Sequence, residues 1–125
     1  MGSYGINNWL YHPQAGIYNG WTQWNPANWF VKDTAITKPT ETPSYFDCIR
    51  WGANPTATDV PPTDLYAGSG DNPNMGRLTI ARHQVPSAAQ APRNHPRTSK
   101  LPGAVNMGFA DGHVAPTKLE NLRSY

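Results

Sequence analysis

The sequence predicts a domain of the α+β class that is mainly antiparallel β, with long loops and little helix. Its 13 prolines and 11 glycines among 125 residues would interrupt helices repeatedly, each at a cost of about 1 to 3 kcal/mol. Aromatic residues make up 11% of the chain and charged residues only 14%, which is the opposite of a disordered composition. The length is that of one domain, so we expect a single unit over residues 1–125, in which residues 1–2 are start or vector residues.

The first half of the chain carries two strand patterns and one helix signal. Residues 4–10 place apolar side chains in the manner of a short strand. Asn25 followed by Pro26 is a typical helix start, which predicts a short helix over 27–32. Residues 44–51 are apolar on both parities, a pattern typical of a strand that is buried on both faces.

Two long segments, 52–76 and 84–101, are rich in proline, and the first also contains several glycines. Loops of this length in a compact domain are often functional or anchored by an ion. Between them, residues 77–83 predict another strand, with Leu78 and Ile80 facing the core.

The clearest local pattern is a C-terminal β-hairpin. Residues 105–110 alternate apolar with small or polar side chains, and the dipeptide Asp111-Gly112 separates them from a second strand over 113–118. Asp and Gly both tolerate positive φ, so the dipeptide predicts a two-residue hairpin turn. Because Pro116 has no N–H to donate, the second strand should lie at an edge of the sheet.

The turn type fixes the expected register of the hairpin, and the residues after it predict how the chain ends. A two-residue turn pairs Phe109 with Val114 and Ala110 with His113. Leu119 and Leu122 follow three residues apart, which predicts a short helical turn that closes the domain.

Five segments of the chain carry a family resemblance. They are Ser-Tyr-Gly-Ile-Asn at 3–7, Phe-Asp-Cys at 46–48, Met-Gly-Arg at 75–77, Arg-His at 82–83 and Asn-Met-Gly-Phe-Ala-Asp-Gly-His-Val at 106–114. In this order they resemble the C-terminal domain of planctomycete and verrucomicrobial pseudopilin-like proteins, which carry a prepilin-type segment and a signature of His, nine residues and Asp-Gly. Here 27 residues separate His83 from Asp111, so we interpret 84–101 as an insertion.

The resemblance implies a pilin or pseudopilin-like head domain built on a small antiparallel sheet. The hydrophobic N-terminal helix of the family is missing from this chain, so an apolar face should be exposed where that helix would pack. The implied function is structural and not enzymatic: a subunit of a type IV pilin-like or type II secretion pseudopilus filament, for assembly and surface display. The implied partners are like subunits or other pseudopilins, the implied location is the periplasm or cell surface, and membrane contact would run only through the missing helix.

Six residues form the structural signature that the family resemblance and the patterns single out. They are Asp47, Arg82, His83, Asp111, Gly112 and His113. Asp47 lies inside an otherwise apolar strand, and a buried carboxylate left without a partner costs several kcal/mol. We expect Arg82 to be that partner, with Arg50 and His113 as alternatives.

His83, Asp111 and His113 are residue types that a transition metal or an acid–base site accepts. Asp111 is already assigned to the hairpin turn, however, which favours a turn-stabilising role over a metal or catalytic one. An enzyme using Asp47, His83 and His113 would rest on residue types alone. Cys48, in a strand expected to be buried, is interpreted as an inert core thiol.

Calcium is the one cofactor that the sequence leaves open. Asp59, Asp64 and Asp71 lie in the long loop, and carboxylate and carbonyl oxygens are the ligands that calcium prefers. Their spacing does not fit an EF-hand, so solvated turn residues are the alternative interpretation.

Two further segments have compositions found in binding surfaces. Tyr18, Trp21 and Trp24 lie among amide and glycine residues, a mixture shared by sugar-binding surfaces, so a secreted carbohydrate-binding module is the alternative function. Residues 93–100 carry three full positive charges, but they lack interleaved aromatic residues and the net charge is only +2. We therefore expect no nucleic-acid partner.

Overall fold

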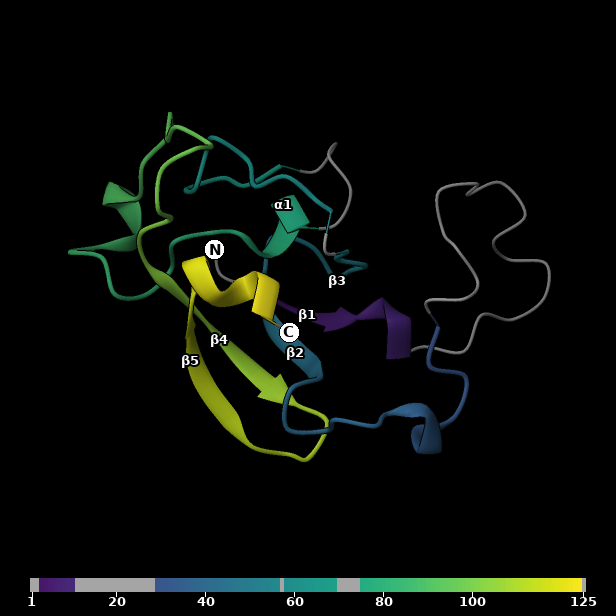
Figure 1. Cartoon of the computed structure of the whole chain (residues 1–125). Helices are drawn as coiled ribbons and strands as arrows, with labels where there is room; N and C mark the ends of the chain where they lie inside the picture. Colours follow the sequence, from purple (N-terminus) through teal and green to yellow (C-terminus); the bar gives the residue numbers. More distant parts are fainter. Residues whose placement is uncertain (1–2, 11–28, 57, 70–74, 125) are drawn as a thin grey trace.

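The computed structural model describes residues 3–10, 29–56, 58–69 and 75–124. They form one five-stranded sheet in the order β3-β1-β2-β4-β5 (Figure 1). The strands are β1 (Ser3–Asn7), β2 (Pro43–Cys48), β3 (Gly52–Ala53), β4 (Ala104–Phe109) and β5 (Val114–Lys118). Neighbouring strands are antiparallel except β1 and β3, which are parallel. The sheet is therefore mixed, and the β-rich α+β class is confirmed.

Helical structure among the described residues is short. The α-helix α1 (Met75–Leu78) has one turn, and the 3₁₀ helices are η1 (Asn8–Leu10), η3 (Asp33–Ala35), η4 (Ala88–Gln90) and η5 (Leu119–Ser124). None of the helices in the described ranges is long and apolar enough to cross a membrane. The strand predicted over 4–10 ends at Asn7, and η1 replaces its last three residues.

The helix predicted over 27–32 is absent from residues 29–32, the part of it that the structure describes. Its start and the preceding Asn25 and Pro26 lie outside the described residues, and residues 29–32 are not helical. The first helical turn after them is η3, which begins at Asp33.

The strand predicted over 77–83 is wrong for most of its length, because its backbone bonds locally. The N–H of Thr79 donates to the carbonyl of Met75 at 2.9 Å, and the N–H of Ile80 donates to that of Leu78 at 2.9 Å. Such short-range bonds make a helical turn and tight turns in place of a ladder. Only His83 pairs with the sheet, through a single bridge to Ala104. Leu78 and Ile80 nevertheless lie in the core, as expected.

The C-terminal hairpin is confirmed, but its register is shifted by one residue. Val114 pairs with Gly108 and not with Phe109, so the loop has three residues, 110–112. The N–H of Gly112 donates to the carbonyl of Phe109 at 3.0 Å, and Gly112 alone in the loop has a positive φ, of 92°. This is the three-residue hairpin loop in which a turn is followed by a left-handed residue, not the predicted two-residue turn.

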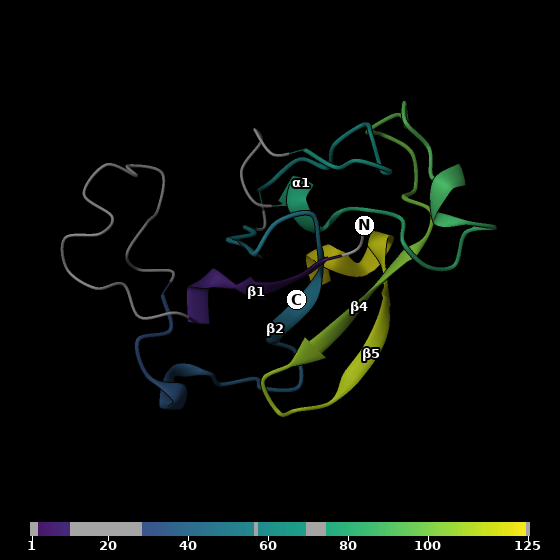
Figure 2. The same ribbon diagram turned by 180° about the vertical axis from the view of Figure 1, so that it is seen from behind.

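The two expectations for the chain end are confirmed. β5, which contains Pro116, is an edge strand of the five-stranded sheet. Leu119 and Leu122 are buried in η5, which folds back over the core side of the sheet next to α1 (Figures 1 and 2).

The core lies on one face of the sheet only. Phe46 of β2 pairs with Met107 of β4, and both side chains are buried against residues from α1, η5 and the two long loops. The fully buried large side chains include Phe46, Leu65, Leu78, Ile80, Val105 and Leu119.

The strand predicted over 44–51 is shorter than expected and is not buried on both faces. β2 ends at Cys48, and Tyr45 and Trp51 are 60% and 64% exposed. Apolar side chains at both odd and even positions of a strand indicate that both of its faces are apolar. They do not indicate that other parts of the same chain pack against both faces.

The two long loops pack against each other over the core. The N–H of Leu65 donates to the carbonyl of Pro92, and the N–H of His95 donates to that of Thr63, each at 2.8 Å. The guanidinium of Arg93 lies 3.8 Å from the ring centroid of Tyr66 in a cation–π contact. Figures 1 and 2 show these segments side by side above α1.

Candidate functional site

The sheet face opposite the core is the candidate interface, and one row of side chains crosses it over four strands. The register places Ile6 opposite Tyr45, Tyr45 opposite Gly108 and Gly108 opposite Val114. Tyr45 is 60% and Val114 72% exposed. A Cβ built on Gly108 would approach no atom closer than 3.9 Å, so packing within the chain does not require a glycine there.

A second row runs parallel to the first. Tyr4 pairs with Asp47, the backbone N–H of Asn106 donates to Asp47 Oδ2 at 2.8 Å, and Asn106 pairs with Pro116. Tyr4 is 73% exposed. The two rows together, Tyr4, Ile6, Tyr45, Asp47, Asn106, Gly108, Val114 and Pro116, are called the open face below. The open face thus presents exposed apolar side chains around one carboxylate.

That carboxylate is engaged by a histidine at the side of the open face. Nε2 of His83 lies 2.9 Å from Oδ2 of Asp47, whose side chain is 12% exposed. The amide nitrogen of Asn106 lies 3.0 Å from the same Nε2. One ring nitrogen cannot donate to a carboxylate and accept from an amide at the same time, so a neutral His83 makes one of these two hydrogen bonds at any moment. The contacts with His83 and with the N–H of Asn106 thus provide hydrogen-bond partners for the largely buried carboxylate of Asp47.

The partner of Asp47 was predicted wrongly. His83 holds the place that Arg82 was expected to fill, because residues 77–83 are not a regular strand and only His83 bridges to β4. The Nε atom of Arg82 is buried and has no hydrogen-bond partner among the described residues. Neither alternative, Arg50 or His113, contacts Asp47 in the described ion pairs.

Asp111 and His113 form a separate contact at the hairpin turn. Nδ1 of His113 lies 2.6 Å from Asp111 Oδ1, which also accepts the His113 backbone N–H at 3.1 Å. These hydrogen bonds lower the pKa of the Asp111 carboxyl below its ordinary value of 3.8. The His113 ring stacks on Phe109 with centroids 4.3 Å apart. Asp111 and Gly112 therefore serve the turn, although by different means from those predicted.

His83 and His113 are not brought together. His83 bridges to Ala104 at one end of β4 and His113 accepts the N–H of Phe109 at the other, a separation of about 16 Å at about 3.3 Å per residue. Within residues 3–10, 29–56, 58–69 and 75–124, no three His, Cys, Asp or Glu side chains are grouped so that they could hold a metal ion.

The acidic residues of the long loop act as local acceptors. Asp59 accepts the hydroxyl of Thr56 at 2.8 Å and the N–H of Met75, the first residue of α1, at 3.1 Å. Asp64 Oδ1 accepts the N–H groups of Tyr66 and Ala67, each at 2.9 Å. The third calcium candidate, Asp71, lies outside the described residues.

The candidate glycan contacts lie outside the described residues, and two of the basic residues of 93–100 contact other side chains of the chain. Tyr18, Trp21 and Trp24, the candidate glycan contacts, lie outside the described residues. In the basic segment, Arg93 stacks on Tyr66 and Lys100 Nζ lies 2.7 Å from Glu120 Oε2.

Cys48 is buried, as expected, on the core side of β2. Burial raises the pKa of its thiol, which keeps the group protonated and unreactive at neutral pH.

An exposed apolar face was expected from the family resemblance, but the sequence did not identify the residues that form it. Tyr4 and Ile6 alternate along one strand, and so do Tyr45 and Asp47, which indicates that each pair shares one face of its strand. Only the strand order shows that the two pairs lie on the same face of the sheet.

No family model matches this chain, and neither the curated proteins nor the solved structures contain a match.

Proposed function

We propose that this domain is the head of a structural subunit in a type IV pilin-like or type II secretion pseudopilus filament, with an α-helix covering its open face. The observation that carries the proposal is the exposure of Tyr4, Tyr45 and Val114 on one face of a sheet whose other face is packed. Large apolar side chains that share one exposed face favour an interaction surface. The motifs at 3–7 and 106–114 support the same assignment through their resemblance to pseudopilin-like proteins.

The side chains of the open face favour an apolar partner, such as the apolar face of a helix, over a charged partner. Its one carboxylate, Asp47, is already paired with His83 and with the N–H of Asn106. Gly108 at the centre of the first row leaves room for a close approach by another backbone. An apolar helix face laid across the two rows would remove the exposed tyrosine and valine side chains from water, which is favourable in proportion to the area buried.

In this role the partners are like subunits or other pseudopilins, the location is the periplasm or the cell surface, and no catalysis is involved. The same resemblance supports each of these statements, and the engagement of Asp47 and Asp111 in structural hydrogen bonds agrees with a role that needs no reactive group.

The test is cysteine labelling of the protein in the cell that makes it. Tyr45→Cys and Val114→Cys place thiols on the open face, and Gln90→Cys is a matched control on the exposed loop helix η4. Cys48 gives no background because it is buried. The proposal expects a maleimide reagent to label the control but not the two open-face cysteines in the assembled envelope, and to label all three in the isolated domain. Equal labelling of all three in the cell would refute it.

A further inference from the structure

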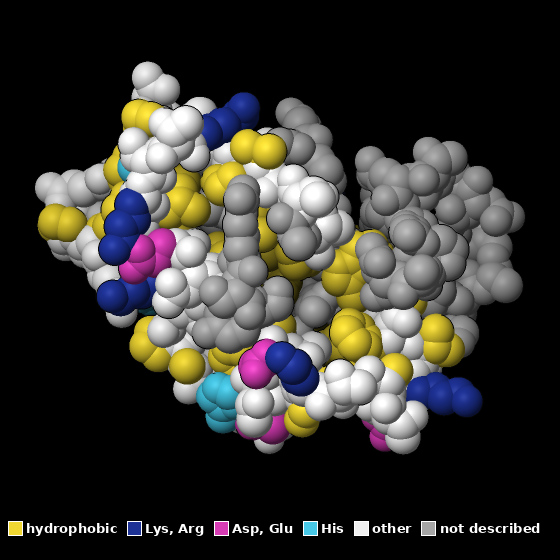
Figure 3. All heavy atoms as spheres, viewed as in Figure 1, with side chains coloured by type: hydrophobic (Ala, Val, Ile, Leu, Met, Phe, Trp, Pro, Cys, Tyr) yellow, Lys and Arg dark blue, Asp and Glu magenta, His cyan; other side chains and the backbone are white. Residues whose placement is uncertain are grey.

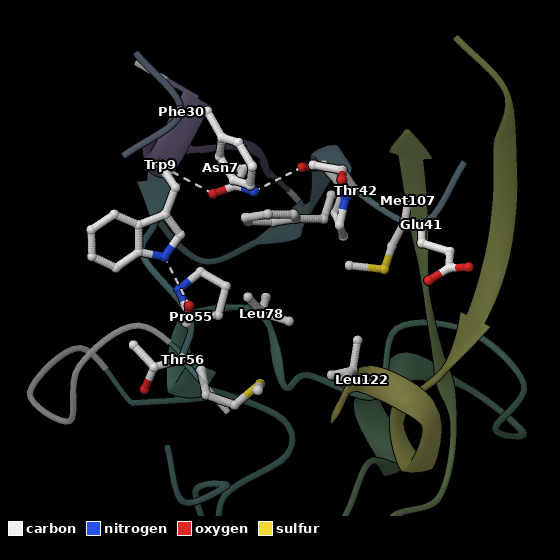
Figure 4. Close-up of a pocket in the computed structure, with 13 residues that line it drawn as sticks. Asn7, Trp9, Phe30, Glu41, Thr42, Pro55, Thr56, Leu78, Met107 and Leu122 are labelled. Atoms are coloured by element: carbon white, nitrogen blue, oxygen red, sulfur yellow. Dashed lines mark hydrogen bonds between the residues drawn. The ribbon is translucent and has the colours of Figure 1, made fainter. Parts of the chain in front are cut away.

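A pocket of about 200 Å³ lies on the core side of the sheet, opposite the open face. Phe46 and Met107 line it from the sheet, Met75 and Leu78 from α1, and Leu122 from η5. Figure 4 shows the labelled side chains of these elements arranged around one common space. Figure 3 shows hydrophobic side chains set back near the centre of the face that it draws.

The remaining wall is held in place by hydrogen bonds. Trp9 and Phe30 line the pocket, and Trp9 Nε1–H donates to the carbonyl of Pro55 at 2.8 Å (Figure 4). Asn7 Nδ2 donates to the carbonyl of Pro43 at 2.8 Å, and Asn7 Oδ1 accepts the N–H of Trp9 at 3.1 Å. The wall is therefore formed before any ligand enters, which lowers the entropy cost of binding.

The polar groups at the pocket already have partners within the chain. Thr42 Oγ1 donates to the carbonyl of Lys38, and Glu41 is paired with the ammonium group of the same lysine. Thr56 Oγ1 lies 2.8 Å from Asp59 Oδ1. A charged ligand would lose its hydration, and Glu41, the one charged residue among the described lining residues, is already paired with Lys38, so binding a charge there is unfavourable. A neutral apolar ligand has no such loss.

The size and the walls narrow the ligand further. A cavity of about 150 Å³ in another protein binds benzene, so about 200 Å³ suits one aromatic ring or a small bicyclic ring. The rings of Trp9, Phe30 and Phe46 offer stacked or edge contacts, and the thioethers of Met75 and Met107 contact aromatic rings favourably. We infer that the pocket binds one neutral aromatic group between benzene and indole in size. This site is distinct from the open face, so it stands or fails independently of the filament role.

The first test is a titration of the protein with toluene and with indole, followed by NMR amide shifts. We expect saturable shifts at Leu78, Met107 and Leu122, with dissociation constants of about 1 mM or tighter. Benzoate, the charged control, should leave these amides unchanged. Failure of both neutral probes to saturate, or saturable shifts at Tyr45 and Val114 in place of the pocket residues, would overturn the inference.

The second test fills the pocket from η5. Leu122→Trp places an indole where the ligand would lie, and Asn121→Trp adds the same group on the exposed side of η5 as a matched control. Leu122→Phe replaces the first variant if that variant does not fold. The affinity for indole should fall at least tenfold in the pocket variant and stay unchanged in the control. Equal affinities in both variants would contradict the assignment of the site.

Discussion

Nε2 of His83 lies 2.9 Å from Oδ2 of Asp47 and so joins two residues that are 36 positions apart in the sequence. His83 stands where the long loop 84–101 leaves the sheet, and Asp47 stands in the central strand β2. The contact therefore holds the start of that loop against the open face. The same carboxylate oxygen also accepts the backbone N–H of Asn106 in β4.

We predict that Asp47→Ala destabilises the domain by about 1–3 kcal/mol, the usual cost of leaving buried donors without an acceptor. The N–H of Asn106 and the ring of His83 both lose their acceptor, and because the Asp47 side chain is only 12% exposed, water replaces it poorly at the Asn106 N–H, whereas the half-exposed His83 ring can turn to water. Asp47→Asn keeps an acceptor oxygen and should lose less. Urea unfolding measures the difference. An unchanged midpoint in Asp47→Ala would show that the cluster contributes nothing to stability.

Gly112→Ala should destabilise the hairpin by about 1 kcal/mol, because a Cβ is unfavourable at its φ of 92°. The cost is purely conformational, since a Cβ there would meet no atom within 4 Å. Gly112→Asn should cost less, because asparagine tolerates the left-handed region better than alanine does. Thermal unfolding of the two variants is the measurement, and equal melting temperatures for alanine and wild type would contradict the turn geometry.

The Asp111 carboxyl should titrate below its ordinary pKa of 3.8, because His113 donates to it from both ring and backbone. A lowered pKa in the folded state means that the contact stabilises the fold above the unfolded-state pKa. That contribution is lost as the pH falls through the folded-state pKa. NMR titration of the Asp111 side chain in wild type and His113→Ala tests this, with a higher pKa expected in the variant. The same pKa in both would exclude the His113 ring as the cause.

Asp59→Ala should destabilise the domain by about 1 kcal/mol, because Asp59 accepts the N–H of Met75 at the start of α1. Melting curves recorded with calcium and with EDTA extend the test to metal binding. If the carboxylate acts only as a hydrogen-bond acceptor, the loss is the same in both buffers. A loss confined to the calcium buffer would instead identify Asp59 as a calcium ligand.

Gly108→Ala should leave the isolated domain as stable as wild type or more stable by up to about 1 kcal/mol. The new Cβ meets only ordinary contacts at 3.9 Å, and alanine is less costly than glycine inside a strand. If a helix docks over the open face as proposed, the same methyl group would obstruct it, so incorporation into filaments should fall. A destabilised isolated domain would show that Gly108 is required by the sheet itself.

The sequence predicted the hairpin, its edge position and the buried leucines of η5, because these depend on local signals. Alternation, an Asp-Gly pair and a proline act within a few residues. The one-residue error in register arose because a three-residue loop that ends at the left-handed Gly112 uses the same dipeptide as a two-residue turn.

The wrong strand at 77–83 and the wrong partner for Asp47 have one common cause. Leu78 and Ile80 are buried, but a buried apolar pair is compatible with a strand and with a helical turn followed by tight turns. Long-range acceptors decide between them: Asp59 accepts at the start of α1, and Leu65 accepts the N–H of Ala81. No sequence pattern near 77–83 contains that information, so the geometry that places His83 on Asp47 could not be derived.

The position of Pro116 at the edge of the sheet limits how copies of this domain can aggregate. His113 accepts from Phe109 across the hairpin, so Val114, Pro116 and Lys118 direct their backbone groups outward from β5. Pro116 interrupts that row of donors at its centre, and Lys118 adds a charge beside it. Amyloid-like extension of the sheet past β5 is therefore disfavoured, which makes that edge a poor template for aggregation of a chain with exposed tyrosines.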